Sequence, residues 1–337
     1  MLRVPDAALN ELLPHHSPAA IAHRYAHKIT DIIEGRVHAA LRELDRLNVG
    51  VVTVADSQYP AILHQLGAEK PPMLFYRGNW DLIHTHVVAI VGTRRSTEYG
   101  NGVAEWLAAD LTRYGITIIS GLALGIDAHA HLGALEAGGN TIAVLGCGID
   151  VLYPQRNARL QERIAHNGLL ISEFAPGEPA LQHHFLQRNR LIARLAGGVI
   201  VVEAGMKSGS HSTVDWATRG GVTVFAVPGP IGREASLGTN ALLLDGAIMI
   251  TSVRDVVEQL PWRVSPVTTS PEGAAPVQPG SPGAARLFDI LGPIGMQIDQ
   301  IARAAHCSTS AALATLAQLE LDGLVRQLPG KRFVRAG

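Results

Sequence analysis

The chain of 337 residues has few cysteines and no long apolar run. Its two cysteines, Cys147 and Cys307, lie far apart and neither belongs to a Cys-x-x-Cys pair, so we expect neither a disulfide framework nor a zinc site. No stretch of about 18 uninterrupted apolar residues is present, and the first residues lack a basic segment followed by an apolar one. We therefore expect no membrane span, no signal peptide and a cytoplasmic location.

The sequence also lacks an excess of charge of either sign. Its 28 Lys and Arg residues nearly balance its 29 Asp and Glu residues, and the formal net charge is −1. This balance argues against a protein that coats nucleic acid through bulk electrostatics. It still allows a local basic pocket, because phosphate binding depends on where the cations lie. With 47% apolar residues, a chain of this length is expected to form two or three domains with well-buried cores.

Several common nucleotide-binding and catalytic motifs are absent. The chain has neither the Gly-x-Gly-x-x-Gly fingerprint of dinucleotide sites after its first central strand nor the P-loop that would support ATP hydrolysis. Gly-x-Ser-x-Gly is missing as well, and Ser210 beside His211 in sequence does not make a catalytic triad. We therefore expect no catalytic residue, no cofactor and no metal.

The first 50 residues carry helical periodicity. Apolar residues recur at three- and four-residue steps between Ile21 and Leu47, which predicts a module of short amphipathic helices. His23 and His27 share one helix face but have no third ligand, so we expect solvated histidines rather than a metal site. A strand, a short helix and a second strand then form a bridge, over about residues 49–79, into the main domain.

The central region alternates short apolar runs with helical patterns. The helices expected between the strands include residues 98–114, 158–166 and 188–195, and seven strands are expected near residues 87–91, 116–119, 141–145, 169–172, 199–202, 222–227 and 248–250. This alternation predicts an α/β fold with a doubly wound parallel sheet. Ligands of such sheets bind beyond the carboxyl ends of the strands, where backbone N–H groups and helix N-termini point outward.

The C-terminal part has a different composition. Residues 263–283 are rich in Pro, Gly, Ser and Thr, which predicts a flexible linker. Three short helices follow, the third with Ser308 as its N-cap, and the tail predicts a hairpin that turns at Pro329-Gly330. This pattern predicts a winged-helix domain over residues 284–337. Its third helix is nearly uncharged, so two roles stay open: protein contact, or duplex DNA contact through the wing residues Lys331, Arg332 and Arg335.

Small, hydroxyl and basic residues gather where the predicted strands end. Turns of this composition at helix starts bind phosphate through backbone N–H groups, hydroxyls and cations. We expect such receptors at three strand ends: Gly92-Thr93-Arg94, Ser120-Gly121 and Lys207-Ser208-Gly209-Ser210. Asp127 is expected to be the N-cap of the helix that follows the second strand end. Several anion sites in a row, without an evident nucleophile or base, favour a binder of an extended polyphosphate.

The largest group of cations lies between Gln182 and Arg194, in the segment QHHFLQRNRLIAR. Arginine forks bind phosphates in a bidentate manner, and an exposed aromatic ring such as Phe185 stacks on an unpaired base. These residues are therefore suited to a nucleic-acid single strand. The alternative is a solvated helix start with Phe185 in the core, and the residues alone leave both interpretations open.

The longest motifs make the chain resemble the DNA-processing protein A family, also called DprA or Smf. They are, in order, GTRRSTEYG, SGLALGIDAHAHLGALEAGG, QHHFLQRNRLIARLAGGVIVVEAGMKSGS and VFAVPGPI. The resemblance implies a SAM-like helical module over residues 1–50, an extended Rossmann-like domain over residues 51–262 and a winged-helix tail. It further implies a non-enzymatic protein that protects incoming single-stranded DNA, forms a homodimer and loads the RecA recombinase during natural transformation and homologous recombination.

The resemblance also assigns DNA contacts, motif by motif. It implies contacts from Gly92, Thr93, Arg94, Ser120, Gly121, Gln182, Phe185, Arg188, Asn189, Arg190, Lys207, Ser208, Gly209 and Ser210. The chain departs from the family pattern at His211, where an apolar residue is usual. A second interpretation is an enzyme similar to the phosphoribohydrolases that act on nucleoside monophosphates, because residues 209–215 faintly resemble their Gly-Gly-x-Gly-Thr-x-Glu segment, with Asp215 in the place of the catalytic acid.

Overall fold

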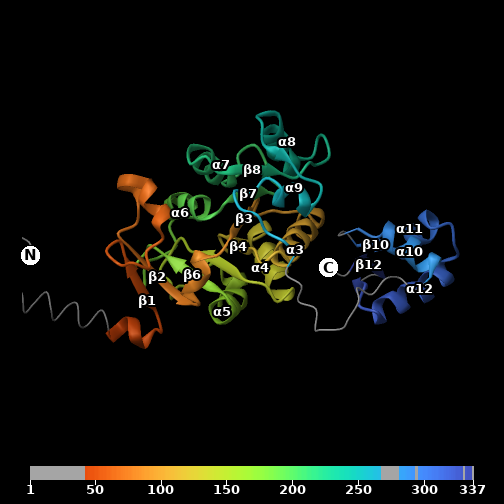
Figure 1. Cartoon of the computed structure of the whole chain (residues 1–337), viewed down its shortest axis with the longest axis horizontal. Helices are drawn as coiled ribbons and strands as arrows, with labels where there is room; N and C mark the ends of the chain where they lie inside the picture. The colour runs from red at the N-terminus through yellow and green to blue at the C-terminus, as the bar shows by residue number, and fades with distance from the viewer. Residues whose placement is uncertain (1–41, 267–280, 293–294, 329–330, 336–337) are drawn as a thin grey trace, which may run out of the picture. The chain divides into compact units, whose positions relative to one another are not determined.

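The computed structural model describes residues 42–266, 281–292, 295–328 and 331–335 (Figure 1). The predicted helices before residue 42, with His23 and His27, lie outside the described residues, as do most of the predicted linker and the turn at Pro329-Gly330. The chain divides into two units after Gly50, and of the first unit only residues 42–50 are described. None of the helices in these described ranges is long and apolar enough to cross a membrane.

A nine-stranded sheet forms the centre of the second unit, in the order β1-β2-β6-β5-β4-β3-β7-β8-β9. The strands β3 to β9 pair in parallel and span Val87–Val91, Thr117–Ser120, Thr141–Val144, Leu169–Ser172, Gly198–Val201, Thr223–Ala226 and Ile248–Met249. Strand order reverses at β3, which lies between β4 and β7. The predicted doubly wound parallel sheet is therefore confirmed.

The two strands expected to form a bridge belong to this sheet. β2 (Met73–Gly78) pairs antiparallel with β6, and β1 (Gly50–Thr53) lies beyond β2 at the edge. The bridge prediction was wrong because the apolar residues of β2 continue the buried surface of the sheet: Leu74 and Phe75 are both buried. An antiparallel edge strand on a parallel sheet is common in α/β folds.

Helices cover both faces of the sheet (Figure 1). Every residue of β3 is buried, and alternate residues face opposite layers, as expected of a strand covered on both sides. Val88 and Ile90 pack in the layer formed by α3 (Glu98–Thr112), α4 (Ile126–Glu136) and α9 (Val253–Val257). Val87, Ala89 and Val91 pack in the layer that contains residues of α6 and α7. The other helices of this unit are α5 (Ala158–Asn167), α6 (Gln182–Leu195), α7 (Ser210–Arg219), α8 (Glu234–Leu244) and the 3-10 helices η1 (Ala61–Glu69), η2 (Trp80–His84) and η3 (Gln155–Asn157).

Helix α6 begins at Gln182 rather than at Arg188, so its predicted start was wrong. The N-cap position is occupied by Leu181, and no side chain caps the helix there. The usual polar start signal is therefore missing from the sequence. The additional first turns place Gln182 and Phe185 on the helix instead of in a loop.

The C-terminal residues form the predicted winged-helix fold. Helices α10 (Pro282–Ile290), α11 (Ile298–Ala304) and α12 (Thr309–Leu321) pack with a small sheet in the order β10-β12-β11. These strands span Met296–Gln297, Arg332–Arg335 and Val325–Leu328, respectively. The core contains Leu287, Ile301, Leu316 and Phe333. Ser308 is the N-cap of α12, as predicted, because its Oγ accepts a hydrogen bond from Ala311 N at 3.2 Å.

Candidate functional site

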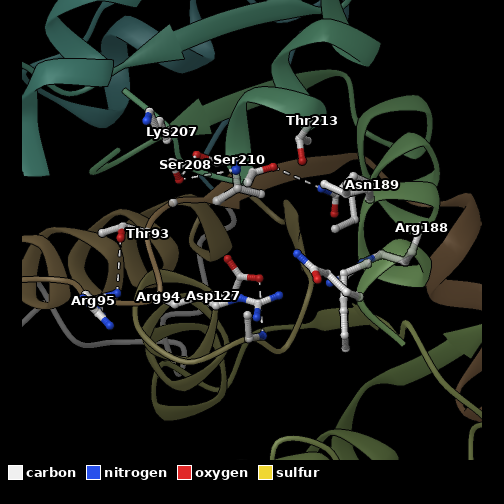
Figure 2. A pocket seen from close by; sticks show the side chains of 18 residues that line it. Thr93, Arg94, Arg95, Asp127, Arg188, Asn189, Lys207, Ser208, Ser210 and Thr213 are labelled. Atoms are coloured by element: carbon white, nitrogen blue, oxygen red, sulfur yellow. Dashed lines mark hydrogen bonds between the residues drawn. The ribbon is translucent and has the colours of Figure 1, made fainter. Parts of the chain in front are cut away.

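A cleft of about 490 Å³ opens at the carboxyl end of β3, beside the reversal of strand order. Figure 2 shows Arg94 and Asp127 on one side of this opening, Arg188 and Asn189 on another, and Lys207 with Ser208 on the loop opposite. The cleft lies where ligands of doubly wound sheets bind. The predicted residues that line it are Gly92, Thr93, Arg94, Gln182, Phe185, Arg188, Asn189, Lys207, Ser208, Gly209 and Ser210.

The turn after β3 is fixed by its backbone. Thr93 N donates a hydrogen bond to Glu203 O at 2.7 Å, and Thr93 O accepts one from Ile126 N at 3.3 Å. Gly92 is needed there, because a Cβ atom would lie only 2.7 Å from Glu203 O. The turn is thus held from two sides, and the side chains of Arg94 and Arg95 remain exposed.

The carboxylate of Glu203, just after β7, is directed at a helix rather than at the cleft. It accepts hydrogen bonds from Thr97 N at 2.8 Å and from Thr97 Oγ1 at 2.5 Å. Thr97 is the N-cap of α3, so this buried negative charge lies at the positive end of the helix dipole. The acidic side chain therefore stabilises α3 instead of repelling an anion in the cleft.

Ser120 ends β4 but does not reach the cleft. Its side chain is fully buried, and Oγ donates a hydrogen bond to Ile90 O at 2.6 Å, which ties β4 to β3. The residue after next, Leu122, adopts a left-handed conformation with φ of 55°, which is strained for a branched side chain. Asn157 Nδ2 holds this strained turn by donating hydrogen bonds to Leu122 O at 2.9 Å and to Ala123 O at 3.1 Å.

Asp127 is not the N-cap of α4, so that prediction was wrong. The N-cap is Gly125, whose φ of 79° leads the chain into a helix that begins at Ile126. Asp127 is buried, and its Oδ2 accepts a hydrogen bond from Ala123 N at 3.4 Å. Burial raises the pKa of this carboxyl, while the nearby positive charge of Arg188 acts in the opposite direction.

Arg188 lies beneath the cleft, with only 3% of its surface exposed. Its Nη1 donates a hydrogen bond to Val144 O, and its guanidinium fills the space in which a Cβ atom on Gly121 would stand. No described residue accepts a hydrogen bond from its Nε. Burial lowers the pKa of Arg188 to about 10, and the charge of Asp127 opposes this shift. Arg188 therefore remains a cation at neutral pH and contributes positive potential from the floor of the cleft.

Arg190 is absent from the cleft lining. Its guanidinium pairs with the carboxylate of Glu173, and its Nε donates a hydrogen bond to Glu69 O at 2.8 Å. Arg194, one turn later, is also buried and bonds to Gln65 Oε1. Both arginines connect α6 to the segment that contains η1, so the structure gives them neighbours within the fold and none in the cleft.

From the sequence, Phe185 was expected either to be exposed for stacking or to lie in the core, and its position in the structure is intermediate. Its ring is half-buried at the edge of the cleft, neither in the core nor freely exposed. The Arg94 guanidinium carbon lies over the ring, 5.1 Å from its centroid, which is cation–π geometry. Phe185 thus holds Arg94 in place at the cleft.

The loop before α7 forms the opposite wall. Ser208 Oγ and Ser210 Oγ are 2.8 Å apart, and Asn189 Nδ2 donates a hydrogen bond from α6 to Gly209 O at 3.3 Å. Lys207 is exposed and forms no ion pair within the part of the chain that the structure describes. His211 Nε2 lies 3.0 Å from Gly205 O, so the imidazole is engaged with the backbone and not with the Ser210 hydroxyl.

The structure adds residues that the sequence did not point to. Arg95, Leu186, Ile192 and Thr213 also line the cleft. The spacing of Thr213, three residues after Ser210 on α7, is a helical signal that could have identified it. Asp215, two residues further on, is exposed and does not line the cleft. Across the described residues, no three His, Cys, Asp or Glu side chains are placed to hold a metal ion.

The cleft has the chemistry of an anion receptor. Three exposed cations surround it, Arg94, Arg95 and Lys207, and the buried charge of Arg188 lies below. The N-terminus of α7 opens into it, and the positive end of this helix dipole favours an anion there. Its first backbone N–H groups are already bonded within the loop, because Ser210 N donates to Ser208 Oγ at 3.4 Å and His211 N donates to Ser208 O at 3.2 Å. The arrangement suits phosphate groups carried on a chain with apolar or aromatic parts, because Phe185, Leu186 and Ile192 share the same lining.

Comparison with known proteins gives two family matches. The family model described as DNA recombination-mediator protein A matches residues 50–261, and the model described as DprA winged helix domain matches residues 271–331. The DNA processing protein DprA of Streptococcus pneumoniae is 44% identical over 207 residues, which cover 61% of this chain and 73% of that protein. Protein Smf of Escherichia coli is 34% identical over 312 residues, covering 91% and 83%, respectively.

Solved structures show the same relationship. The X-ray structure of DNA processing protein A from Streptococcus pneumoniae has a TM-score of 0.65 and 37% identity, and the match covers 77% of this chain and 88% of that one. DNA processing protein A from Helicobacter pylori, whose structure is described in terms of its single-stranded DNA binding mode, has a TM-score of 0.56 and 34% identity. That match covers 62% of this chain and 94% of the other.

Proposed function

Because the chain belongs to the DNA recombination-mediator protein A family, we propose that it binds single-stranded DNA in the cleft at the carboxyl end of β3. One observation carries this proposal: the exposed cations Arg94, Arg95 and Lys207 surround a cleft whose carboxylates are turned elsewhere or buried. Glu203 caps α3, and the Asp127 carboxylate is buried beside Arg188. The proposed contacts are those predicted residues that line the cleft, together with Arg95.

A single strand suits this cleft better than a duplex does. Its phosphates reach the cations, while its unpaired bases are free to contact apolar and aromatic groups. A duplex keeps its bases in its own stack and offers only its backbone to such a surface. The half-buried ring of Phe185 and the side chains of Leu186 and Ile192 would then have no partner in the ligand.

The family description, recombination mediator, supports a role after DNA binding. We propose that the protein acts in the cytoplasm, protects incoming single-stranded DNA and loads the RecA recombinase onto it during natural transformation and homologous recombination. It works as a binding protein without a catalytic step. The competing phosphoribohydrolase interpretation gains nothing from the cleft, because Asp215 does not line it.

The proposed homodimer is supported by apolar side chains left exposed around α8. Leu237 and Leu244 lie seven residues apart on this helix, so they share one face, and Leu244 is 90% exposed. Met249 on the edge strand β9 and Ile231 before α8 are exposed as well. We call these four exposed residues the α8 patch. A second copy of the chain would cover such a patch through a two-fold contact.

For the winged-helix domain we propose a protein contact. The Arg335 guanidinium packs over the Phe288 ring at 4.0 Å and donates a hydrogen bond to Phe288 O at 2.7 Å, so this wing cation is held inside its own domain. The third helix, α12, exposes Leu313 and Leu321, which are apolar side chains at positions that would face a partner. This surface is suited to a protein more than to a phosphate backbone.

Titration of a labelled oligonucleotide tests the proposed function. We expect salt-dependent affinity for a single strand that exceeds the affinity for the same sequence as a duplex. Equal affinity for both forms would contradict the proposal. Incubation with AMP provides the second arm: release of the free base by the purified protein, abolished in Asp215→Asn, would instead support the phosphoribohydrolase interpretation.

A further inference from the structure

Tyr153 presents an aromatic ring at the edge of the cleft, and it belongs to neither the core nor the predicted site. It lies in the loop between β5 and η3 and is 39% exposed. Its ring is inclined by 31° to that of Phe185, with the two centroids 5.3 Å apart, which is a tilted aromatic contact. The two rings therefore form one aromatic unit that extends from α6 to the solvent.

Within this unit Phe185 is enclosed. Arg94 lies over its ring, Tyr153 contacts it, and Gly146 approaches so closely that a Cβ atom there would stand 2.6 Å from Phe185 Cδ1. These neighbours cover part of the Phe185 ring, which is half-buried, and limit the room for a base on it. The exposed ring of Tyr153 is the part of the aromatic unit that a base can approach directly.

A small cavity of about 50 Å³ joins the two aromatic residues to the phosphate side of the site. Tyr153 and Phe185 line it together with Arg94 and residues Gly121 to Leu124. Arg94, Ala123 and Phe185 line the main cleft as well. Tyr153 is therefore next to the surface on which the cations lie, within reach of the same bound strand.

We propose that Tyr153 is a stacking platform for an unpaired base of the bound strand, with Phe185 as the support that fixes the orientation of its ring. The inference rests on the proposed single-strand binding and adds a contact to it. A nucleotide whose phosphate is held by Arg94 would carry its base only a few bonds away, and Tyr153 lines the same small cavity as Arg94. Stacking is tolerant of sequence because every base has a π-face, so the site accepts any unpaired base.

Substitutions that keep or remove the ring test this assignment. Affinity for a short oligothymidylate is measured by fluorescence anisotropy in the wild type, Tyr153→Ala and Tyr153→Phe. Tyr153→Ala is expected to weaken binding by about tenfold, the effect of losing one base–aromatic stack. Tyr153→Phe is expected to bind like the wild type, because Tyr153 Oη forms no hydrogen bond with any residue of the described ranges.

A set of oligonucleotides, each with one abasic position, identifies the base concerned. In the wild type, one abasic position is expected to reduce affinity about as much as Tyr153→Ala does. In Tyr153→Ala the same position is expected to have no further effect, because the ring that it would contact is already gone. Thermal unfolding of Tyr153→Ala checks that the variant is folded. A misfolded protein would lose affinity for every oligonucleotide, whereas loss of one stack changes the effect of one abasic position only.

The results distinguish a failure of the Tyr153 assignment from a failure of the proposed single-strand binding. Failure of the wild type to bind single strands overturns the proposed function. Normal binding by Tyr153→Ala, or equal losses at the abasic position in both proteins, overturns the stacking role of Tyr153 and leaves single-strand binding intact.

Discussion

Arg190 and Glu173 form a bidentate ion pair in which Nη1 lies 2.5 Å from Oε1 and Nη2 lies 2.7 Å from Oε2. Both side chains are less than one tenth exposed. Arg188, two residues earlier on α6, faces the floor of the cleft instead, because residues at i and i+2 of a helix point in different directions. Two arginines that are nearly adjacent in sequence thus have different roles: Arg188 contributes charge to the site, and Arg190 attaches α6 to the rest of the fold.

Arg190→Met is therefore expected to reduce stability and not DNA affinity. It removes the cation from the buried Glu173 carboxylate and leaves only the hydrogen bond from Gln187 Nε2 at 3.0 Å, which costs up to about 3–5 kcal/mol of unfolding free energy. Replacing both residues, as in Arg190→Met with Glu173→Leu, is expected to restore most of that loss. Urea unfolding measures the first effect, and anisotropy on the folded variant measures the second. A stable Arg190→Met protein with weakened DNA binding would show that Arg190 contacts the strand after all.

Lys207→Ala is expected to weaken single-strand binding and to make it less dependent on salt. Lys207 is exposed on the loop before α7 and has no ion-pair partner within the described ranges, so a phosphate is its natural counterion. Loss of one phosphate contact lowers the slope of log affinity against log salt by about 0.7. Titrations at several salt concentrations measure this slope. Lys70→Ala is the matched control, because Lys70 follows η1 and does not line the cleft; an equal change in both variants would indicate a non-specific effect of net charge.

The sequence was sufficient to predict the sheet and the strand ends at which the cleft opens. Runs such as Val87–Val91 are too apolar for strands with a solvated face, and the glycines that end them mark the turns at which a cleft forms. The cleft residues on the two flanking loops, Thr93, Arg94 and Lys207, follow directly from this pattern. Their location depends on the order of strands and turns, which local sequence encodes.

The direction of individual side chains could not be predicted in the same way. The missing cap at Leu181 hid the true start of α6, so the orientation of each residue around this helix was unknown, and Arg190 was grouped with Arg188. Ser120 does end β4, as expected, but the sequence could not show that its hydroxyl is turned toward Ile90 O and away from the cleft. The contact between Tyr153 and Phe185 joins a loop residue to a residue of α6, and it depends on the folded sheet.

Gly121→Ala is expected to weaken single-strand binding by displacing Arg188, which lies at the floor of the cleft. Its backbone does not require glycine through a positive φ, but the new Cβ atom would collide with the Arg188 guanidinium and push it from its hydrogen bond to Val144 O. Loss of such a charged contact, worth roughly 1.5 kcal/mol, corresponds to about tenfold weaker binding if Arg188 supports the strand. Gly283→Ala is the control, because only Ser281 Oγ lies within 4 Å of its added Cβ. Unchanged affinity in Gly121→Ala would remove Arg188 from the proposed site.

His131 is expected to make stability depend on pH. It is fully buried; its Nδ1 lies 2.7 Å from Thr141 Oγ1, and Thr141 Oγ1 donates its own proton to Ile118 O at 2.9 Å. Nδ1 must therefore carry the imidazole proton, and a second proton on Nε2 would find no acceptor among the described residues. Burial, with a smaller contribution from Arg188, lowers the pKa of His131 to about 3.

The sign of the effect follows from this lowered pKa. Between pH 6.5 and about 3 the unfolded chain binds a proton at His131 that the folded chain does not, so stability falls as pH decreases through this range. In His131→Asn the loss on acidification should be shallower by up to about 1.4 kcal/mol per pH unit. Urea unfolding at several pH values measures the two slopes. His166→Asn, at an exposed histidine on α5, is the control, and parallel slopes in the wild type and His131→Asn would contradict the assignment.

Leu244→Asp is expected to convert the proposed homodimer to a monomer while leaving single-strand binding to each chain intact. Leu244 is almost fully exposed at the end of α8, so a carboxylate there does not disturb the core, but in a two-fold contact it would place two like charges against the apolar partner surface. Light scattering measures the mass of each form. Leu321→Asp is a matched control, because Leu321 is 83% exposed and belongs to the winged-helix domain. Dissociation by Leu321→Asp and not by Leu244→Asp would move the dimer contact from the α8 patch to α12, and a wild type that is monomeric at all concentrations would exclude the homodimer.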